Sequence, residues 1–137
     1  MDYAFEFGGF PQDVTITASG YARVSHFREL FKALCDQPSF EAGMRVLLDL
    51  CDVDMSEVPR MDAPEIGRSL AEFQERCEGC SIAVVTRDPL TAVLTRAAEF
   101  SLSAEQVGVW VACTREEALT WLEAQTALHA ERPLANT

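Results

Sequence analysis

The chain opens with two short segments in which apolar and polar side chains alternate, residues 3–7 and 14–18. Alternation with a period of two is typical of strands that bury one face. Gly8, Gly9 and Pro11 lie between the two segments and favour a turn. The pattern therefore predicts an opening β-hairpin.

After the hairpin, helical stripes of apolar residues alternate with short continuous apolar runs. Three of the stripes begin at residues that can cap a helix: Ser25, Asp62 with Glu65, and Thr114 with Glu117. The predicted elements are, in order, a helix over 25–34, a strand over 44–50, a helix over 62–77, a strand over 81–86, a helix over 88–98, a strand over 107–112 and a helix over 114–128.

The order ββαβαβαβα predicts an α/β fold built on a single mixed, mainly parallel five-stranded sheet with four helices. Strands separated by one helix are joined by right-handed crossovers and therefore run parallel. The 137 residues fit one domain, which we expect to span residues 1–130. The tail over 131–137 has little to bury and is expected to fray.

The chain carries a net charge of −11, and its eleven Lys and Arg residues form no basic run. Such a surface repels phosphate groups, so neither nucleic acid nor an anionic membrane is expected as a partner. No stretch approaches the ~20 apolar residues of a membrane-spanning helix. The first residues lack the basic and apolar regions of a secretory signal, so a cytoplasmic location is the expectation.

Several segments carry a likeness to a known family. They are residues 36–40 leading into 43–50, the strand 82–85, the pair Arg96-Ala97 and residues 117–122. In these segments the sequence resembles STAS-like domains, specifically the bacterial SpoIIAA-like group, whose architecture is shared by the lipid-binding CRAL-TRIO modules. The resemblance spans Phe5 to Leu122 and falls mostly on core and boundary positions. It implies a non-enzymatic regulatory or protein-interaction module.

The best-understood members of that family carry a phosphorylatable serine in an Asp-Ser-Ser/Thr-Gly turn before the second helix. The comparable segment here, residues 53–64, lacks that motif, and Ser56 is the nearest serine. Asp52, Asp54 and Glu57 flank Ser56, and a phosphate that adds about −1.5 to −2 charge would be repelled by them. A phosphorylation-controlled switch of the anti-sigma-antagonist kind is therefore only the second alternative.

No complete catalytic site is expected. Neither His26 nor His129 is placed beside a nucleophile, and His26 is expected in the first turn of a helix, away from the strand ends. Gly8 and Gly9 precede a strand rather than a helix, which excludes a phosphate-binding loop. The chain is predicted not to be an enzyme and to hold no cofactor.

The five cysteines are an odd number in a chain without a secretory signal, which argues against a disulfide framework. Cys77 and Cys80 have C-x-x-C spacing, but they fall at the end of a helix, where the dipole does not activate a thiol. Gly79 is expected to end that helix in a left-handed conformation. A zinc site would need a second pair of ligands that the sequence lacks, so structural cysteines and no metal are expected.

Three acidic residues, Asp49, Asp52 and Asp54, fall at and beyond the carboxyl end of a predicted strand. Open α/β sheets bind ligands at that end. Together with Ser56 they form a candidate ligand-binding or regulatory loop. They could hold Mg²⁺ or Ca²⁺ only if further oxygens converge, so a solvated acidic loop is favoured.

The alternative site is an apolar pocket between the sheet and the helices on one face, which would make the chain a carrier or sensor of a small hydrophobic, lipid-like ligand. The side chains expected to line it are Phe73, Leu90, Leu94, Phe100, Leu102 and Trp110. The same stripe could also be ordinary core. The predicted partner is thus a protein or a small apolar ligand, and a homodimer through an exposed edge of the opening strands is a further alternative.

Overall fold

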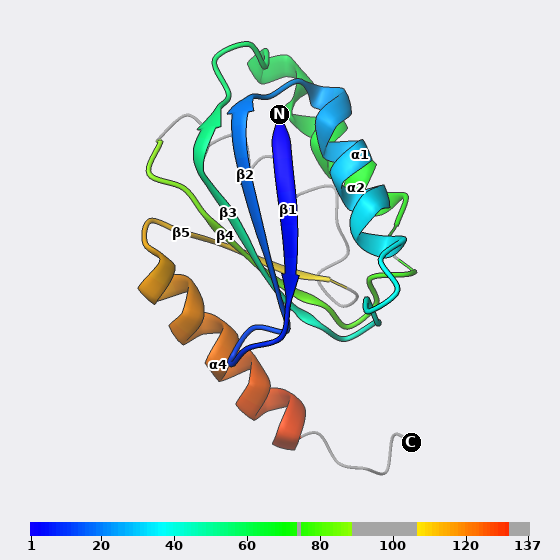
Figure 1. Ribbon diagram of the computed structural model, residues 1–137, viewed down its shortest axis with the longest axis vertical. Helices are drawn as coiled ribbons and strands as arrows, with labels where there is room; N and C mark the ends of the chain where they lie inside the picture. Colours follow the sequence, from blue (N-terminus) through cyan, green and yellow to red (C-terminus); the bar gives the residue numbers. More distant parts are fainter. Residues whose placement is uncertain (74, 89–106, 132–137) are drawn as a thin grey trace.

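Five strands form one mixed sheet, and helices pack on both of its faces (Figure 1). The computed structural model describes residues 1–73, 75–88 and 107–131. The elements are β1 (Asp2–Phe7), β2 (Val14–Tyr21), α1 (Val24–Cys35), β3 (Arg45–Asp54), the 3-10 helix η1 (Arg60–Asp62), α2 (Ala63–Ala71), β4 (Ser81–Val85), β5 (Gly108–Ala112) and α4 (Arg115–Glu131).

The strands lie in the sheet in the order in which they occur in the chain. β1 and β2 are antiparallel, with Phe5 opposite Ile16, and the other three neighbouring pairs are parallel. The predicted opening hairpin and the mixed five-stranded sheet are confirmed. The described ranges contain three α-helices. The helix predicted over 88–98 falls, apart from its first residue, outside them.

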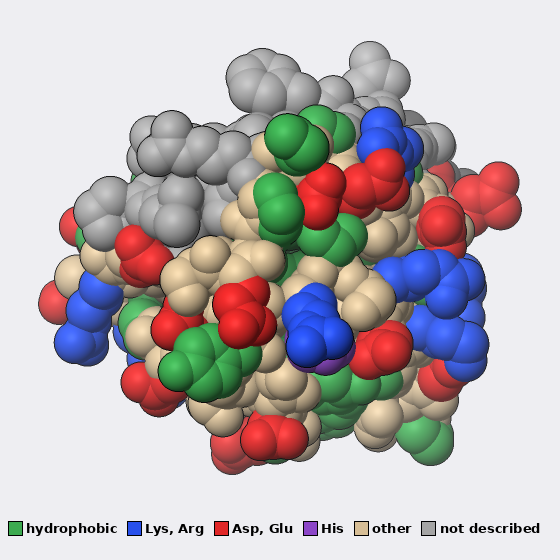
Figure 2. All heavy atoms as spheres, turned by 90° about the horizontal axis from the view of Figure 1, so that it is seen from above, with side chains coloured by type: hydrophobic (Ala, Val, Ile, Leu, Met, Phe, Trp, Pro, Cys, Tyr) green, Lys and Arg blue, Asp and Glu red, His purple; other side chains and the backbone are tan. Residues whose placement is uncertain are grey.

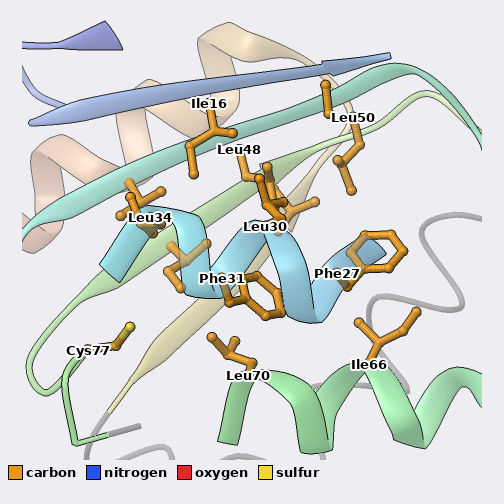
Figure 3. Close-up of a cluster of buried hydrophobic side chains, with 14 of the residues drawn as sticks. Ile16, Phe27, Leu30, Phe31, Leu34, Leu48, Leu50, Ile66, Leu70 and Cys77 are labelled. Carbon is orange, nitrogen blue, oxygen red and sulfur yellow. The ribbon is translucent and has the colours of Figure 1, made fainter. Parts of the chain in front are cut away.

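The first face of the sheet, the face covered by α1 and α2, is apolar. Alternate residues of β2 and β3 point to it, and Ile16 lies beside Leu48 across the two strands. α1 packs on this face by its apolar stripe and lies against α2. Figure 3 shows Leu30 on the side of Ile16 and Leu48, and Phe31 on the side of Leu70. This layer is the main core.

The second face is covered by α4 over β3, β4 and β5. Ala118 and Leu122 of α4 are fully buried there, against a set of mostly small side chains. That set is Leu47, Ala83, Val85 and Ala112. Over β1 and β2 the same face carries exposed side chains, Ala4, Glu6 and Thr17. Within the ranges that the structure describes, the two faces are therefore covered unequally, and polar pockets can form beside α4.

One pair of charged residues holds the start of β2 against the start of β3. Asp13 Oδ2 accepts hydrogen bonds from the backbone N–H and the Nε of Arg45 at 2.8 and 2.9 Å, and Oδ1 accepts one from Nη2 at 2.8 Å. The Asp13 N–H donates to the Arg45 carbonyl at 2.8 Å. The two side chains are only 27% and 22% exposed. This clamp fixes the point from which β2 and β3 pair, because a bidentate pair constrains both distance and angle.

β3 is longer than predicted. The pattern ended the strand at Leu50, whereas β3 runs to Asp54. A bulge in its pairing with β2, between Thr17 and Ser19, keeps the polar end of β3 in the sheet as far as the pair Tyr21 and Asp54. Hydrogen bonding between the backbones of β2 and β3 therefore extends β3 through residues whose polar side chains had predicted its end.

α2 is shorter than predicted, because it ends at Ala71 and residues 75–79 form turns. Arg76 in this segment donates hydrogen bonds to Asp36 and to the carbonyl of Cys35, which draws the segment toward the end of α1. Gly79 has the expected left-handed conformation, with φ +78°, but it ends these turns rather than a helix.

Two predicted helix caps are wrong in detail, and one is confirmed. α1 begins at Val24, and the side chain that serves its first turn is His26, whose Nδ1 accepts the Arg23 N–H at 3.0 Å, rather than Ser25. Asp62 precedes α2 as predicted, but its side chain makes no capping hydrogen bond. The Thr114 cap of α4 forms: its Oγ1 accepts the Glu117 N–H at 3.1 Å.

Replacing Asp13 by Asn should weaken the clamp while keeping its shape. We expect the free energy of unfolding at pH 7 to fall by about 2 kcal/mol, since charge-assisted hydrogen bonds are lost. Hydrogen bonding to Arg45 holds the pKa of Asp13 below its ordinary value. The stabilisation by the carboxylate is therefore complete above the ordinary pKa of ~3.9 and is lost as the pH falls through the lower folded-state pKa. Urea unfolding near neutral pH and at pH ~2.5 measures the difference.

Glu72→Gln is the matched control, because Arg28 and Glu72 form an ion pair whose side chains are 53% and 52% exposed. Such pairs contribute roughly 0–1 kcal/mol. Equal losses in the two variants would contradict the role given to the clamp.

Leu122→Ala tests how the second face is held. The side chain is fully buried, so we expect a loss of about 2–4 kcal/mol in the free energy of unfolding. Hydrogen exchange should speed up in α4 and β5 more than in α1, which packs on the other face. Leu119→Ala, at a half-buried position of the same helix, should cost less. Uniformly faster exchange across the chain would show that α4 does not open separately.

Candidate functional site

The acidic residues that the sequence singles out lie within β3 rather than in a loop beyond it. Asp49 points to the second face, where its Oδ1 accepts the Cys51 N–H at 2.9 Å and its Oδ2 accepts Nη2 of Arg115 at 3.2 Å. Burial alone would raise the pKa of Asp49, but the hydrogen bond from Cys51 and the charge of Arg115 outweigh burial and hold the pKa below its ordinary value. Asp49 is thus a carboxylate already engaged by the protein.

Asp54 and Ser56 are engaged with each other at the end of β3. Asp54 Oδ1 accepts the Ser56 N–H at 2.8 Å, and hydrogen bonding by the Ser56 side chain, then by this N–H, lowers the pKa of the Asp54 carboxyl group. Both residues are exposed. Ser56 lies seven positions before the first residue of α2, so it is not at the start of that helix. The structure does not assemble Asp49, Asp52, Asp54 and Ser56 into one ligand set, since Asp49 faces α4 and Asp54 turns to Ser56.

Two polar pockets meet at Arg115. The strand-end pocket, of about 330 Å³, is lined by Asp49, Cys51, Asp52, Val85, Arg87, Thr114 and Arg115. The hairpin pocket, of about 510 Å³, is lined by Glu6, Phe7, Gly8, Gly9, Gln12, Thr15, Thr17 and Arg115. Cations and carboxylates are mixed in both, so neither presents a surface of one charge.

Arg115 is the site residue that sequence reasoning missed. It is the first residue of α4 and is placed by the capping box, in which Glu117 also accepts the Cys113 N–H at 3.2 Å. The sequence did contain a signal for this position, because the predicted cap Thr114 lies two positions after the end of the last predicted strand. What the sequence could not give is the partner of Arg115, since Asp49 lies 66 positions away in the chain.

The described members of the predicted apolar pocket do not line one cavity. Phe73 packs against the core of the first face. Trp110 lies opposite Ala83 in β4 and therefore points to the second face. Leu90, Leu94, Phe100 and Leu102 lie outside the described residues.

Trp110 packs against an aromatic residue of α4 rather than against the other predicted pocket residues. Its ring stacks on that of Trp121 in α4, with centroids 5.7 Å apart and an angle of 27° between the planes. The two rings border a shallow groove of about 640 Å³ together with Thr114, Glu116, Glu117, Thr120 and Ala124. Trp110 remains 40% exposed, so this aromatic pair is a surface feature.

Two groups that could serve catalysis, His26 and Cys51, are already engaged by the protein. His26 lies at the carboxyl end of the sheet, because α1 directly follows β2; the expected placement away from the strand ends is wrong. Its Nδ1 is used at the start of α1. Burial, then the neighbouring Asp49, raise the pKa of the Cys51 thiol, which disfavours the nucleophilic thiolate. His129 lies in α4, near the end of the described chain.

Across the described ranges, no three His, Cys, Asp or Glu side chains are arranged to hold a metal ion. Within the same ranges no helix combines the length and the apolar character needed to cross a bilayer.

Comparison with known proteins identifies a fold. No protein-family model matches the chain, and no curated protein matches it. A solved structure that is similar is the crystal structure of an uncharacterised protein of the DUF3478 family with a SpoIIAA-like fold, from Shewanella loihica PV-4. The likeness covers 88% of this chain and 92% of that one, with a TM-score of 0.56 and 14% identity. The resemblance seen in the sequence is confirmed as one of architecture: the chain has a SpoIIAA-like fold.

Proposed function

We propose that this chain is a non-catalytic regulatory module of the STAS-like kind, which acts by binding another protein. We place the contact at the carboxyl end of the sheet, on a loop-end surface made by Tyr21, Asp54, Ser56, Glu57 and Met61. The observation that carries the proposal is the exposure of two large apolar side chains on this surface, 63% for Tyr21 and 84% for Met61.

The loop that carries Met61 is anchored rather than loose. Met55 and Val58 are 1% and 4% exposed, and the Val58 N–H donates to the Met55 carbonyl at 3.0 Å. The Ala22 N–H donates to the Asp54 carbonyl at 2.9 Å, which ties the end of β2 to the end of β3. A fixed backbone that leaves Tyr21 and Met61 in solvent is typical of a binding surface, because little conformational entropy is lost on contact.

The charges around these side chains suggest the character of the partner. Asp54 and Glu57 are exposed on the same surface, in a chain whose net charge is −11. Figure 2 shows hydrophobic side chains that reach the surface at this end of the molecule beside acidic and basic ones. An apolar centre flanked by Asp54 and Glu57 fits a protein surface with an apolar centre and with Lys or Arg opposite these two carboxylates.

Three further observations agree with a binding module. The fold is SpoIIAA-like, His26 serves a helix start, and Cys51 is held as a thiol.

All five cysteines are free thiols, which supports the reducing conditions of a cytoplasm. Ser56 has carboxylates for neighbours, which disfavours the phosphorylation-controlled alternative.

Photo-crosslinking in cells tests the location of the contact. A benzophenone amino acid replaces Tyr21, Met61 or, as the control, Phe10, which is 68% exposed but lies in the β1–β2 turn at the opposite end of β2. Adducts with one protein are expected from positions 21 and 61. An adduct of twice the chain mass would identify a homodimer instead. Equal adducts from position 10 would contradict the proposed location.

Affinity measurements with the identified partner test the energetics. Tyr21→Ser and Met61→Ser should each weaken binding about tenfold, since exposed apolar residues at the centre of an interface contribute roughly 1–2 kcal/mol or more. Phe10→Ser should leave the dissociation constant unchanged. Binding should also weaken as salt is raised, because acidic residues on the chain face basic ones on the partner. Unchanged affinity in both serine variants would refute the proposal.

A further inference from the structure

Three of the five cysteines meet where the end of α1 touches the turns after α2. Cys35 is the last residue of α1, Cys77 lies in the turns, and Cys80 directly precedes β4. The sulfur atoms of Cys35 and Cys77 are 3.7 Å apart, although the residues are 42 positions apart in the chain. The three residues are 6%, 1% and 2% exposed. Figure 3 shows Cys77 close to the end of α1 that carries Leu34.

The turns that carry Cys77 are fastened to the end of α1 by the preceding residue. Arg76 Nη2 donates to the carbonyl of Cys35, and Nη1 donates to Asp36 Oδ1 at 3.2 Å. The guanidinium is thus held at the backbone of Cys35, and its charge acts on the Cys35 thiol. The two hydrogen bonds of Arg76 therefore hold the turns that carry Cys77 against the end of α1, where Cys35 lies.

We propose that Cys35 and Cys77 form an oxidation site, at which hydrogen peroxide converts the two thiols into a reversible intramolecular disulfide. The Cys35 thiolate attacks one peroxide oxygen and the O–O bond breaks. The sulfur becomes a sulfenic acid, and the departing hydroxide takes up a proton to leave as water. The Cys77 sulfur then attacks the sulfenic sulfur, the S–OH bond breaks, and a second water forms with the proton of Cys77. The two sulfurs supply the two electrons that reduce the peroxide.

The electrostatics assign these roles to the two cysteines. A hydrogen bond from the Cys77 thiol lowers the pKa of Cys35, and the charge of Arg76 lowers it further against the effect of burial. The pKa of Cys77 is raised by its hydrogen bonds to the two neighbouring thiols and by burial. Cys35 is accordingly the thiolate that meets the oxidant, and it is also the most exposed of the three.

Cys80 is the competing partner for Cys77, and its pKa is lowered too, first by the Cys77 thiol and then, against burial, by the backbone N–H groups of Gly43 and Met44. Geometry favours Cys35, because its sulfur lies 3.7 Å from that of Cys77 and Arg76 fastens the turns that carry Cys77 to the Cys35 carbonyl. The Cys80 N–H donates to the Cys77 carbonyl at 2.9 Å. A metal is not favoured either, because the three thiols are not arranged to hold one.

The disulfide would close a loop that contains β3, η1 and α2, and would join α1 to the turns after α2. A covalent link of this length restricts the unfolded chain, so the oxidised protein should resist unfolding more than the reduced one. This inference does not depend on the proposed protein partner.

The test is peroxide treatment of the folded full-length chain, followed by denaturation, alkylation of the remaining thiols and tryptic mapping. Cleavage after Lys32, Arg45, Arg76 and Arg87 places Cys35 in peptide 33–45 and Cys77 in peptide 77–87. We expect these two peptides to be linked, with a loss of ~2 Da. The melting temperature should rise and should return to its starting value when a dithiol reductant is added.

Variants separate the alternatives. Cys80→Ala removes the second cysteine of peptide 77–87 and should leave the link in place, and so should Cys113→Ala, which removes the exposed thiol. Cys35→Ser should abolish the link. A Cys77–Cys80 disulfide would overturn the proposal. So would oxidation confined to Cys113, with Cys35 and Cys77 both still open to alkylation in the unmodified chain.

Discussion

The clamp between Asp13 and Arg45 is the constraint on which the arrangement of the sheet depends. It joins the end of the β1–β2 turn to the first residue of β3, two points 32 positions apart in the chain. Parallel strands receive no register from a tight turn, so some other contact must supply it. Here one carboxylate engages both the backbone and the side chain of Arg45. A slip of one residue would break these hydrogen bonds and turn the apolar side of β3 away from α1.

Once that register is set, the two faces of the sheet take on different roles. The first face buries its branched side chains under α1 and α2 and supplies most of the core. Among the described residues, α4 covers the second face over β3, β4 and β5, and the polar remainder holds the two pockets that meet at Arg115. Stability and surface chemistry are thus divided between opposite sides of one sheet.

The sequence was informative wherever an element is set by its own pattern. The hairpin, the stripe of α1 and the Thr114 cap each depend on neighbours a few positions away, and each was predicted. The end of β3 was missed, because pairing with β2 holds polar residues in the strand. The end of α2 was missed because Arg76 draws the next residues toward Asp36. Contacts such as Asp49 with Arg115 and Cys35 with Cys77 join distant segments, and no local pattern encodes them.

The unequal cover of the sheet also bears on how the chain folds during its synthesis. α4 follows all five strands in the chain, so the side chains of β3 and β4 that it buries meet it only after the whole sheet has been synthesised. Ala83 and Ala112 keep part of the surface that waits for α4 small, whereas the leucine and valine side chains that β3 buries on the first face lie between α1 and α2 in the chain. A nascent sheet with less exposed apolar area offers other chains less to adhere to. The alanines beneath α4 therefore protect the protein before it is complete.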